Sequence, residues 1–171
     1  ENLDLAKIES SEMVFKYAPI ALSLLVAESA AGHQIAAQNK GLRFTLDLAD
    51  DLPEQLLTDP MRLRQILNNL LNNAVKFTER GEIFFSVRPT GDGIVFTVRD
   101  TGIGIPPDSL GTIFEKFKQL ESFLTREHGG TGLGLALVRQ LAEHLGGHVT
   151  VESEVGVGSA FTVFLPLEPP A

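Results

Sequence analysis

The stretch LNNLLNNAVKFT, residues 67–78, places four asparagines inside a strongly apolar helical pattern. Asparagine is a mediocre helix former, because its amide competes for the hydrogen bonds of the backbone. The helix itself is well marked. Asp59 supplies a capping carboxylate, Pro60 suits the first helical position, and we expect the helix to run to about Phe77. The asparagines therefore need an explanation other than helix stability.

A helical wheel over residues 60–77 separates the four asparagines into two pairs. Asn68 and Asn72 fall on the far side, where solvent is expected, whereas Asn69 and Asn73 fall along the edge of the buried face. An amide at that edge can offer its oxygen to a hard cation such as Mg²⁺ and its NH₂ group to phosphate oxygens. The alternative interpretation is a plain polar helix face. The apolar stripe comprises Leu63, Ile66, Leu67, Leu70, Leu71, Ala74 and Phe77, and Arg62 and Lys76 share the flank of Asn69 and Asn73.

The composition excludes several classes of protein. A chain of 171 residues is long enough for one domain with a full core. It contains no cysteine, which excludes disulfides and thiolate chemistry and agrees with a cytoplasmic location. A formal net charge of −8 disfavours nucleic acid as a partner. No run of about 18 apolar residues is present, so the sequence predicts no transmembrane helix.

The helical and strand patterns fall into separate groups. This arrangement predicts an α+β fold, a two-layer sandwich in which a mixed, mostly antiparallel sheet packs on about three helices. Glycine-rich turns at 91–93 and 156–158 predict two hairpins. We expect helices over residues 19–39, 60–77, 107–117 and 131–145, and strands over residues 12–17, 42–48, 82–89, 94–100, 148–154 and 159–167.

Two glycine-rich segments are candidates for binding a ligand. In DTGIGIP, residues 100–106, Gly102 and Gly104 permit a tight loop that a flat ligand can approach. Asp100, at the end of a strand, can accept a hydrogen bond from an exocyclic amine such as that of adenine. Most Asp-Thr-Gly segments are ordinary turns, so this motif alone is weak evidence.

The second segment, GGTGLGLAL at residues 129–137, leads directly into a helix, whose amino end suits phosphates. It matches neither the P-loop nor the dinucleotide-binding fingerprint. Residues 113–128 between the two glycine segments are typical of a mobile lid. The alternative is that Phe114 and Phe117 are ordinary core residues of a short helix.

In this order, NLLNNAVKFT, DTGIGIP, FEKF and GGTGLGLAL resemble the catalytic ATP-binding domain of sensor histidine kinases. That domain has the Bergerat fold, shared with gyrase and mismatch-repair ATPases. The resemblance covers about residues 15–167, and it implies ATP and Mg²⁺ as cofactors. We accordingly expect residues 1–11 to be the end of a dimerisation helix, 12–167 to be the catalytic domain, and 168–171 to be a tail.

The resemblance also assigns roles to individual residues. Asn73 is similar to the Mg²⁺ ligand of the family, and Asn69 and Lys76 match catalytic positions at the phosphates. Phe77 would pack near the nucleotide, and Asp100 would read the adenine amine. The other positions implied in ATP binding are Gly102, Gly104, Ile105, Gly130, Thr131, Gly132, Leu133, Gly134 and Thr162.

Two positions distinguish this chain within the superfamily. Gyrase-type ATPases carry a water-activating glutamate where this chain has Asn69, and an amide has no useful proton affinity near neutral pH. The resemblance therefore implies phosphoryl transfer to a protein side chain in preference to rapid ATP hydrolysis. Lys118-Gln119 replaces an aromatic-arginine pair that is common in the lid, so no lid cation at the γ-phosphate is implied.

The phosphoacceptor of such kinases is a histidine in a His-Glu/Asp context followed by Arg and Pro, and no histidine of this sequence has that context. We therefore expect the acceptor on dimerisation helices outside this chain, a response-regulator receiver domain as the next partner, a monomeric fragment and a homodimeric parent. The parent's membrane attachment would depend on other segments. Rival hypotheses are a nucleotide-dependent interaction module and a stand-alone ATPase. The four histidines are His33, His128, His144 and His148.

Overall fold

The computed structural model describes residues 14–110 and 133–168. Within these ranges the chain forms eleven helices and strands. In chain order they are β1 (Ala18–Ala21), α2 (Leu22–Asn39), β2 (Arg43–Leu48), β3 (Gln55–Thr58), α3 (Pro60–Phe77), β4 (Glu82–Pro89), β5 (Gly93–Asp100), α4 (Pro107–Leu110), α6 (Leu133–His144), β6 (His148–Glu154) and β7 (Gly158–Pro166).

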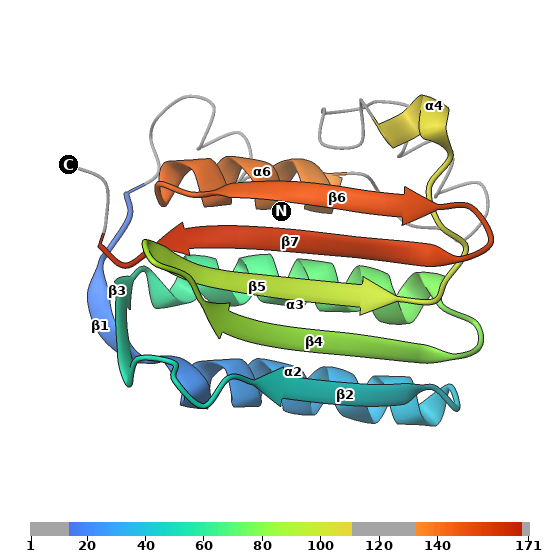
Figure 1. Ribbon diagram of the computed structural model, residues 1–171, viewed down its shortest axis with the longest axis horizontal. Helices are drawn as coiled ribbons and strands as arrows, with labels where there is room; N and C mark the ends of the chain where they lie inside the picture. Colours follow the sequence, from blue (N-terminus) through green and yellow to red (C-terminus); the bar gives the residue numbers. More distant parts are fainter. Residues whose placement is uncertain (1–13, 111–132, 169–171) are drawn as a thin grey trace.

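The main sheet has five strands in the order β2-β4-β5-β7-β6. Strands β2 and β4 are parallel, and the other neighbours are antiparallel. The helices α2, α3 and α6 all lie behind one face of this sheet (Figure 1). The predicted two-layer α+β sandwich, with its mixed, mostly antiparallel sheet and three packed helices, is confirmed.

The core lies between the sheet and these helices. Alternation along β5 turns Ile94, Phe96 and Val98 toward the helices, where they are at most 1% exposed. The leucine stripe predicted on α3 is buried against them. Each fully buried side chain of this size stabilises the fold by about 1.5–3 kcal/mol relative to exposure.

Helix α3 begins where the sequence predicts. The Asp59 carboxylate accepts hydrogen bonds from the backbone amides of Met61 at 3.1 Å and Arg62 at 3.2 Å. Its second oxygen accepts from the amide of Lys16 at 2.7 Å. This cap satisfies two of the amides that a helix start leaves unpaired, and it also fixes the incoming chain.

The start of the first long helix was predicted wrongly. Pro19 lies in strand β1, which pairs antiparallel with β3, and helix α2 begins only at Leu22. A short two-stranded sheet tolerates a proline that lacks an N–H, and the pairing buries Ile20. Strand β3 was not predicted, because its four residues are too short to show a pattern.

Two further boundaries differ from the prediction. Residues 14–17 form no strand, although a strand was expected over residues 12–17. Helix α4 covers Pro107–Leu110, and the rest of the helix expected over 107–117 lies outside the described residues. Gly41 and Gly146 follow the ends of helices α2 and α6 with φ of 79° and 90°, the left-handed conformation in which a glycine commonly ends a helix.

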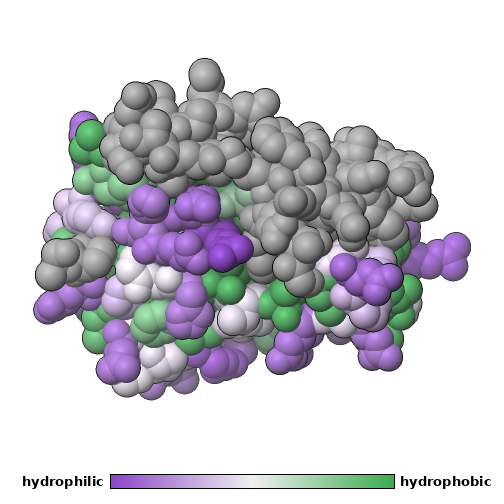
Figure 2. All heavy atoms as spheres, turned by 90° about the horizontal axis from the view of Figure 1, so that it is seen from above, coloured by the Kyte–Doolittle hydropathy of each residue, from purple (hydrophilic) through white to green (hydrophobic). Residues whose placement is uncertain are grey.

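Across residues 14–110 and 133–168, no helix is long and apolar enough to cross a bilayer. Figure 2 views the molecule from the top of Figure 1. On the described part of that face, the hydrophobic patches are small and are separated by hydrophilic residues (Figure 2).

Candidate functional site

A pocket opens between helix α3, helix α6 and the adjoining ends of strands β5 and β7. It encloses about 420 Å³, its open mouth included. Among the described residues, most of its lining is apolar, and the polar side chains are one carboxylate, one amide and one hydroxyl. The lining residues are Leu70, Asn73, Ala74, Phe77, Asp100, Ile103, Gly104, Ile105, Leu135, Ser159 and Phe161.

Helix α3 contributes one face to this pocket. Its four lining residues stand at positions i, i+3, i+4 and i+7, a spacing that keeps them on one side of a helix. Three of them are apolar, so Asn73 brings the only polar side chain from this helix into the pocket. They are Leu70, Asn73, Ala74 and Phe77.

The predicted separation of the asparagines is confirmed by their exposure. Asn68 and Asn72 are exposed, and Asn69 and Asn73 are half-buried at the edge of the apolar face. The Asn72 side chain lies 3.1 Å from the Nε2 atom of His33 on α2, so it links two helices. Asn69 precedes Asn73 by one turn on the same flank, although it does not line the pocket.

Asp100 ends strand β5 and is held by two backbone amides. Its Oδ1 atom accepts hydrogen bonds from Gly102 at 2.9 Å and from Ser159 at 3.3 Å. Among the described residues, none donates to the other oxygen. Burial raises the pKa of Asp100 above its ordinary value of 3.8, and the two amide hydrogen bonds act in the opposite direction. A partly buried carboxylate with one free acceptor oxygen therefore lies in a mostly apolar pocket.

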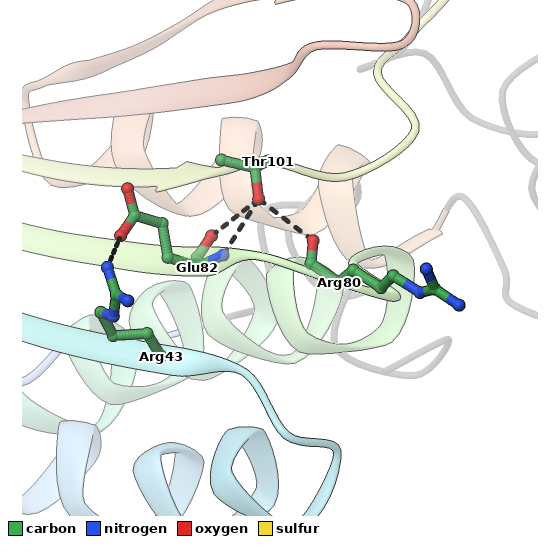
Figure 3. Close-up of polar contacts among 4 residues, drawn as sticks. All are labelled: Arg43, Arg80, Glu82 and Thr101. Carbon is green, nitrogen blue, oxygen red and sulfur yellow. Dashed lines mark hydrogen bonds and ion pairs between the residues drawn. The ribbon is translucent and has the colours of Figure 1, made fainter.

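The β5–α4 loop, residues 101–106, starts from a fixed point. The Thr101 hydroxyl accepts a hydrogen bond from the amide of Glu82 at 3.0 Å and lies 3.3 Å from the carbonyl oxygen of Arg80. Figure 3 shows this hydroxyl linked by dashed lines to both Arg80 and Glu82, at the start of β4. The Thr101 amide also donates to the carbonyl of Glu82 at 3.2 Å. The loop is thus anchored directly after Asp100.

The tight loop expected from Gly102 and Gly104 is confirmed. A Cβ atom on Gly102 would lie 2.4 Å from the carbonyl oxygen of Phe77. Gly104 has a φ of 76°, and a Cβ atom there would lie 2.2 Å from the carbonyl oxygen of Glu154. These glycines are required because other backbone segments of the protein approach them closely. That a ligand also approaches this loop stays a prediction.

Several residues of the predicted site lie outside the pocket lining. Lys76 is exposed, and its ammonium nitrogen lies 5.6 Å from the centre of the Phe77 ring. Thr162 faces the opposite side of the sheet from Phe161, with its hydroxyl 3.5 Å from that of Thr97, so we do not retain it in the site. Gly134 is buried in the first turn of α6.

The predicted phosphate loop and lid are only partly within the described structure. Leu133 is the first residue of helix α6. Gly130, Thr131 and Gly132, and the segment 113–128, lie outside the described residues. Their contribution to the site stays a prediction.

Sequence reasoning missed six lining residues. Four of them carry a readable signal. Leu70 and Ala74 belong to the apolar stripe beside Asn73, Ile103 lies between the two loop glycines, and Leu135 lies in the glycine-rich segment 129–137. Ser159 and Phe161 have no such signal, because only the register of β7 against β5 brings them to Asp100.

The oxygen atoms of the pocket suit magnesium only in a limited role. Within the described ranges, no group of three or more His, Cys, Asp or Glu residues could hold a metal ion. Mg²⁺ usually keeps several waters and binds substrate phosphates with one or two protein oxygens. The Asn73 amide oxygen in the pocket fits that role, as an amide can coordinate a hard cation.

Known sensor proteins and histidine kinases are similar to this chain in sequence. The chain is 46% identical over 166 residues to the circadian input-output histidine kinase CikA of Synechococcus elongatus, covering 96% of this chain and 22% of CikA. It is 43% identical over 167 residues to the aerobic respiration control sensor protein ArcB of Escherichia coli, covering 94% of this chain and 21% of ArcB. The chain thus spans about a fifth of the length of these relatives.

Solved structures are also similar to this chain in fold. Full-length ShkA in complex with AMPPNP has a TM-score of 0.85 and 35% identity, covering 99% of this chain and 35% of ShkA. The catalytic domain of the histidine kinase ThkA has a TM-score of 0.77 at 24% identity, covering 91% of this chain and 100% of that one, and so supports the fold. Residues 58–169 match the family model described as histidine kinase-, DNA gyrase B-, and HSP90-like ATPase. The chain belongs to this family of ATPase domains.

Proposed function

We propose that this domain binds ATP with Mg²⁺ and is the catalytic domain of a sensor histidine kinase. It would transfer the γ-phosphoryl group to a histidine on dimerisation helices outside this chain. The observation that carries the proposal is the pocket itself, in which Asn73 offers an amide and Asp100 offers an oxygen that accepts from no other described residue. The 35% identity to ShkA, which was solved with AMPPNP, supports a nucleotide as the ligand.

The apolar part of the pocket suits a purine ring. Leu70, Ile105 and Phe161 offer aliphatic and aromatic surface, and Asp100 can accept a hydrogen bond from the exocyclic amine of adenine. Such a donor would offset part of the cost of keeping this carboxylate away from water. The site would therefore prefer adenine to purines that carry a carbonyl oxygen in that place.

The edge of helix α3 suits the phosphates. Asn73 would hold the magnesium ion, Asn69 would contact the phosphates one turn earlier, and Lys76 would supply a positive charge. The bound magnesium would neutralise charge on the triphosphate. Backbone amides at the start of α6, next to Gly134, would add an electropositive helix end.

Phosphoryl transfer needs a nucleophile that this pocket does not supply. An imidazole nitrogen of the acceptor histidine would form the N–P bond while the bond from the γ-phosphorus to the bridging oxygen breaks, and ADP leaves with that electron pair. The domain would contribute position and electrostatic stabilisation, because the amide of Asn69 cannot serve as a general base for water.

Calorimetric titration with ATP and Mg²⁺ tests the binding site. We expect a dissociation constant on the order of micromolar to millimolar, which Asn73→Ala and Asp100→Asn both weaken. Asn68→Ala is the matched control, because this asparagine lies on the same helix but is exposed. Unchanged binding in both site variants would reject the site, and a wild-type domain that binds no ATP would reject the function.

A second experiment separates kinase from interaction module and ATPase. Addition of a purified dimerisation segment that bears its histidine should yield acid-labile phosphate, whereas an interaction module would yield none. Substantial phosphate release by the domain alone would favour the ATPase.

We further propose that this domain alone is monomeric and that the full-length kinase is a homodimer with this domain in the cytoplasm. A receiver domain would then accept the phosphoryl group.

A further inference from the structure

The β6–β7 hairpin is attached to the β5–α4 loop through one side chain. The Ser153 hydroxyl accepts a hydrogen bond from the backbone amide of Ile105 at 2.8 Å. The same oxygen lies 2.7 Å from the hydroxyl of Ser159 and 3.1 Å from the carbonyl oxygen of Gly158. Ser153 therefore joins the end of the loop to the start of strand β7.

The backbones of the β5–α4 loop and the β6–β7 hairpin are also in close contact. The Gly156 amide donates to the carbonyl of Ile103 at 2.9 Å. A Cβ atom on Gly104 would lie 2.2 Å from the carbonyl oxygen of Glu154, and one on Gly158 would lie 2.0 Å from that of Asp100. The loop and the hairpin tip lie side by side at one end of the sheet (Figure 1). The loop consequently has little room to move relative to the hairpin.

The hydrogen-bond count shows what Ser153 adds to these contacts. A hydroxyl has one proton to donate and two lone pairs to accept with. If Ser153 donates to the carbonyl of Gly158, it can accept from both Ile105 and Ser159, and every partner within reach is satisfied. Removal of this hydroxyl would leave the Ile105 amide without its acceptor and the Ser159 hydroxyl without this partner.

Both segments that Ser153 joins are connected to Asp100. The Ser159 amide donates to the Oδ1 atom of Asp100, and the loop held at Ile105 begins directly after Asp100. These contacts leave the second carboxylate oxygen without a donor among the described residues. Ser153 itself does not line the pocket. Any effect it has on a ligand must therefore pass through Asp100, Ser159 and the loop.

We propose that Ser153 is a positioning residue for nucleotide recognition, whose hydroxyl fixes the β5–α4 loop and Ser159 so that Asp100 faces the amine of adenine. This inference rests on the proposed binding of ATP in the pocket. It differs from a purely structural role, because it predicts an effect on the choice between adenine and purines that lack the amine.

The test compares two substitutions of equal shape. Ser153→Val and Ser153→Thr both place a branched side chain on a strand that suits one, but only threonine keeps the hydroxyl. Titration calorimetry would measure Mg²⁺-dependent binding of ATP and of inosine triphosphate, which carries a carbonyl oxygen in place of the amine. We expect Ser153→Val to weaken ATP about tenfold and inosine triphosphate less than about twofold. Ser153→Thr should restore ATP binding to within about twofold of wild type.

Thr150→Val is the control for substitution on the same strand, because Thr150 is exposed. It should leave both affinities unchanged. The inference is overturned if Ser153→Val binds ATP like wild type, if both triphosphates weaken equally, or if threonine fails to restore what valine removes. A wild-type domain that binds no ATP would instead reject the proposed function, so the two failures are distinguishable.

One measurement does not depend on a folded variant. The Ile105 amide donates to a side-chain oxygen, so in the wild-type domain we expect slow hydrogen exchange at this position. Exchange as fast as that of an unstructured loop would show that the Ser153 bond is not formed. That result would overturn the inference even if Ser153→Val did not fold.

Discussion

Replacement of Asp100 by asparagine separates the charge of this side chain from its hydrogen bonds. Asparagine keeps an oxygen that can accept from the amides of Gly102 and Ser159, so the loop and strand β7 stay attached. The variant loses the negative charge and presents an NH₂ donor in place of the free acceptor. A hydrogen bond to a charged group contributes about 1.5–3 kcal/mol. Affinity for ATP should therefore fall about tenfold to 150-fold.

Without nucleotide, the same change should leave the domain as stable as wild type or more stable at neutral pH. Burial raises the pKa of Asp100 above 3.8. The carboxyl group of Asp100 therefore binds its proton more tightly in the folded domain than in the unfolded chain. The contribution of Asp100 to stability is thus full below about pH 3.8 and is lost as the pH rises through the raised folded pKa. An asparagine side chain does not titrate in this range, so Asp100→Asn should not show this loss.

Titration calorimetry measures the affinity, and scanning calorimetry from acidic to neutral pH measures the melting temperature. The chain has 22 Asp and Glu residues, so the informative quantity is the difference between wild type and variant at each pH. We expect this difference to move in favour of Asp100→Asn as the pH rises. A variant that binds ATP like wild type, or that becomes relatively less stable toward neutral pH, would refute the reasoning.

Three further substitutions test the core, the loop and the helix cap. Phe96→Ala should lower the free energy of unfolding in urea by about 3–5 kcal/mol, and a loss below about 1 kcal/mol would mean that this ring is not a core residue. Gly104→Ala should abolish calorimetric ATP binding because its Cβ atom would strike the carbonyl of Glu154, whereas Gly91→Ala, which has open space, should bind normally; equal binding would contradict the geometry. Asp59→Ala should lower the free energy of unfolding in urea by about 1–2 kcal/mol, and Asp59→Asn, which can still cap the helix, should lower it less. Equal losses in the two variants would mean that the cap is unimportant.

The sequence predicted those elements that carry their own local signals. Helix α3 has a cap, a proline and a long apolar period, and its bounds were predicted correctly. Strand β4 alternates clearly and was also placed correctly. Strands β1 and β3 have four residues each and are defined only by pairing with one another across 30 or more intervening residues. Nothing within either segment reports that pairing, so Pro19 was read as a helix start.

The same distinction applies to the pocket. Asn73, Asp100 and Gly104 were predicted from motifs that are contiguous in the chain, and the structure brings them together. Ser159 was missed, because it reaches the pocket through its pairing on the neighbouring strand with Asp100, from which it is 59 residues away in the sequence. Thr162 was assigned to the site, but alternation along β7 turns it to the other face of the sheet.

The two parts of the proposed site are held in physically different ways. The carboxylate of Asp100 is held by the backbone amides of Gly102 and Ser159, and the proposed support from Ser153 reaches it through the loop and Ser159. Asn69 and Asn73 instead depend on the edge of one helix, where each amide is half-buried. Substitutions in the hairpin should therefore alter the choice of base, whereas substitutions of these two asparagines should alter binding of the phosphates. Because neither asparagine can activate water, we propose that the outcome depends on the nucleophile brought to this pocket. The rate of phosphoryl transfer should then follow the presence of the proposed dimerisation helices more than any change in the affinity for ATP.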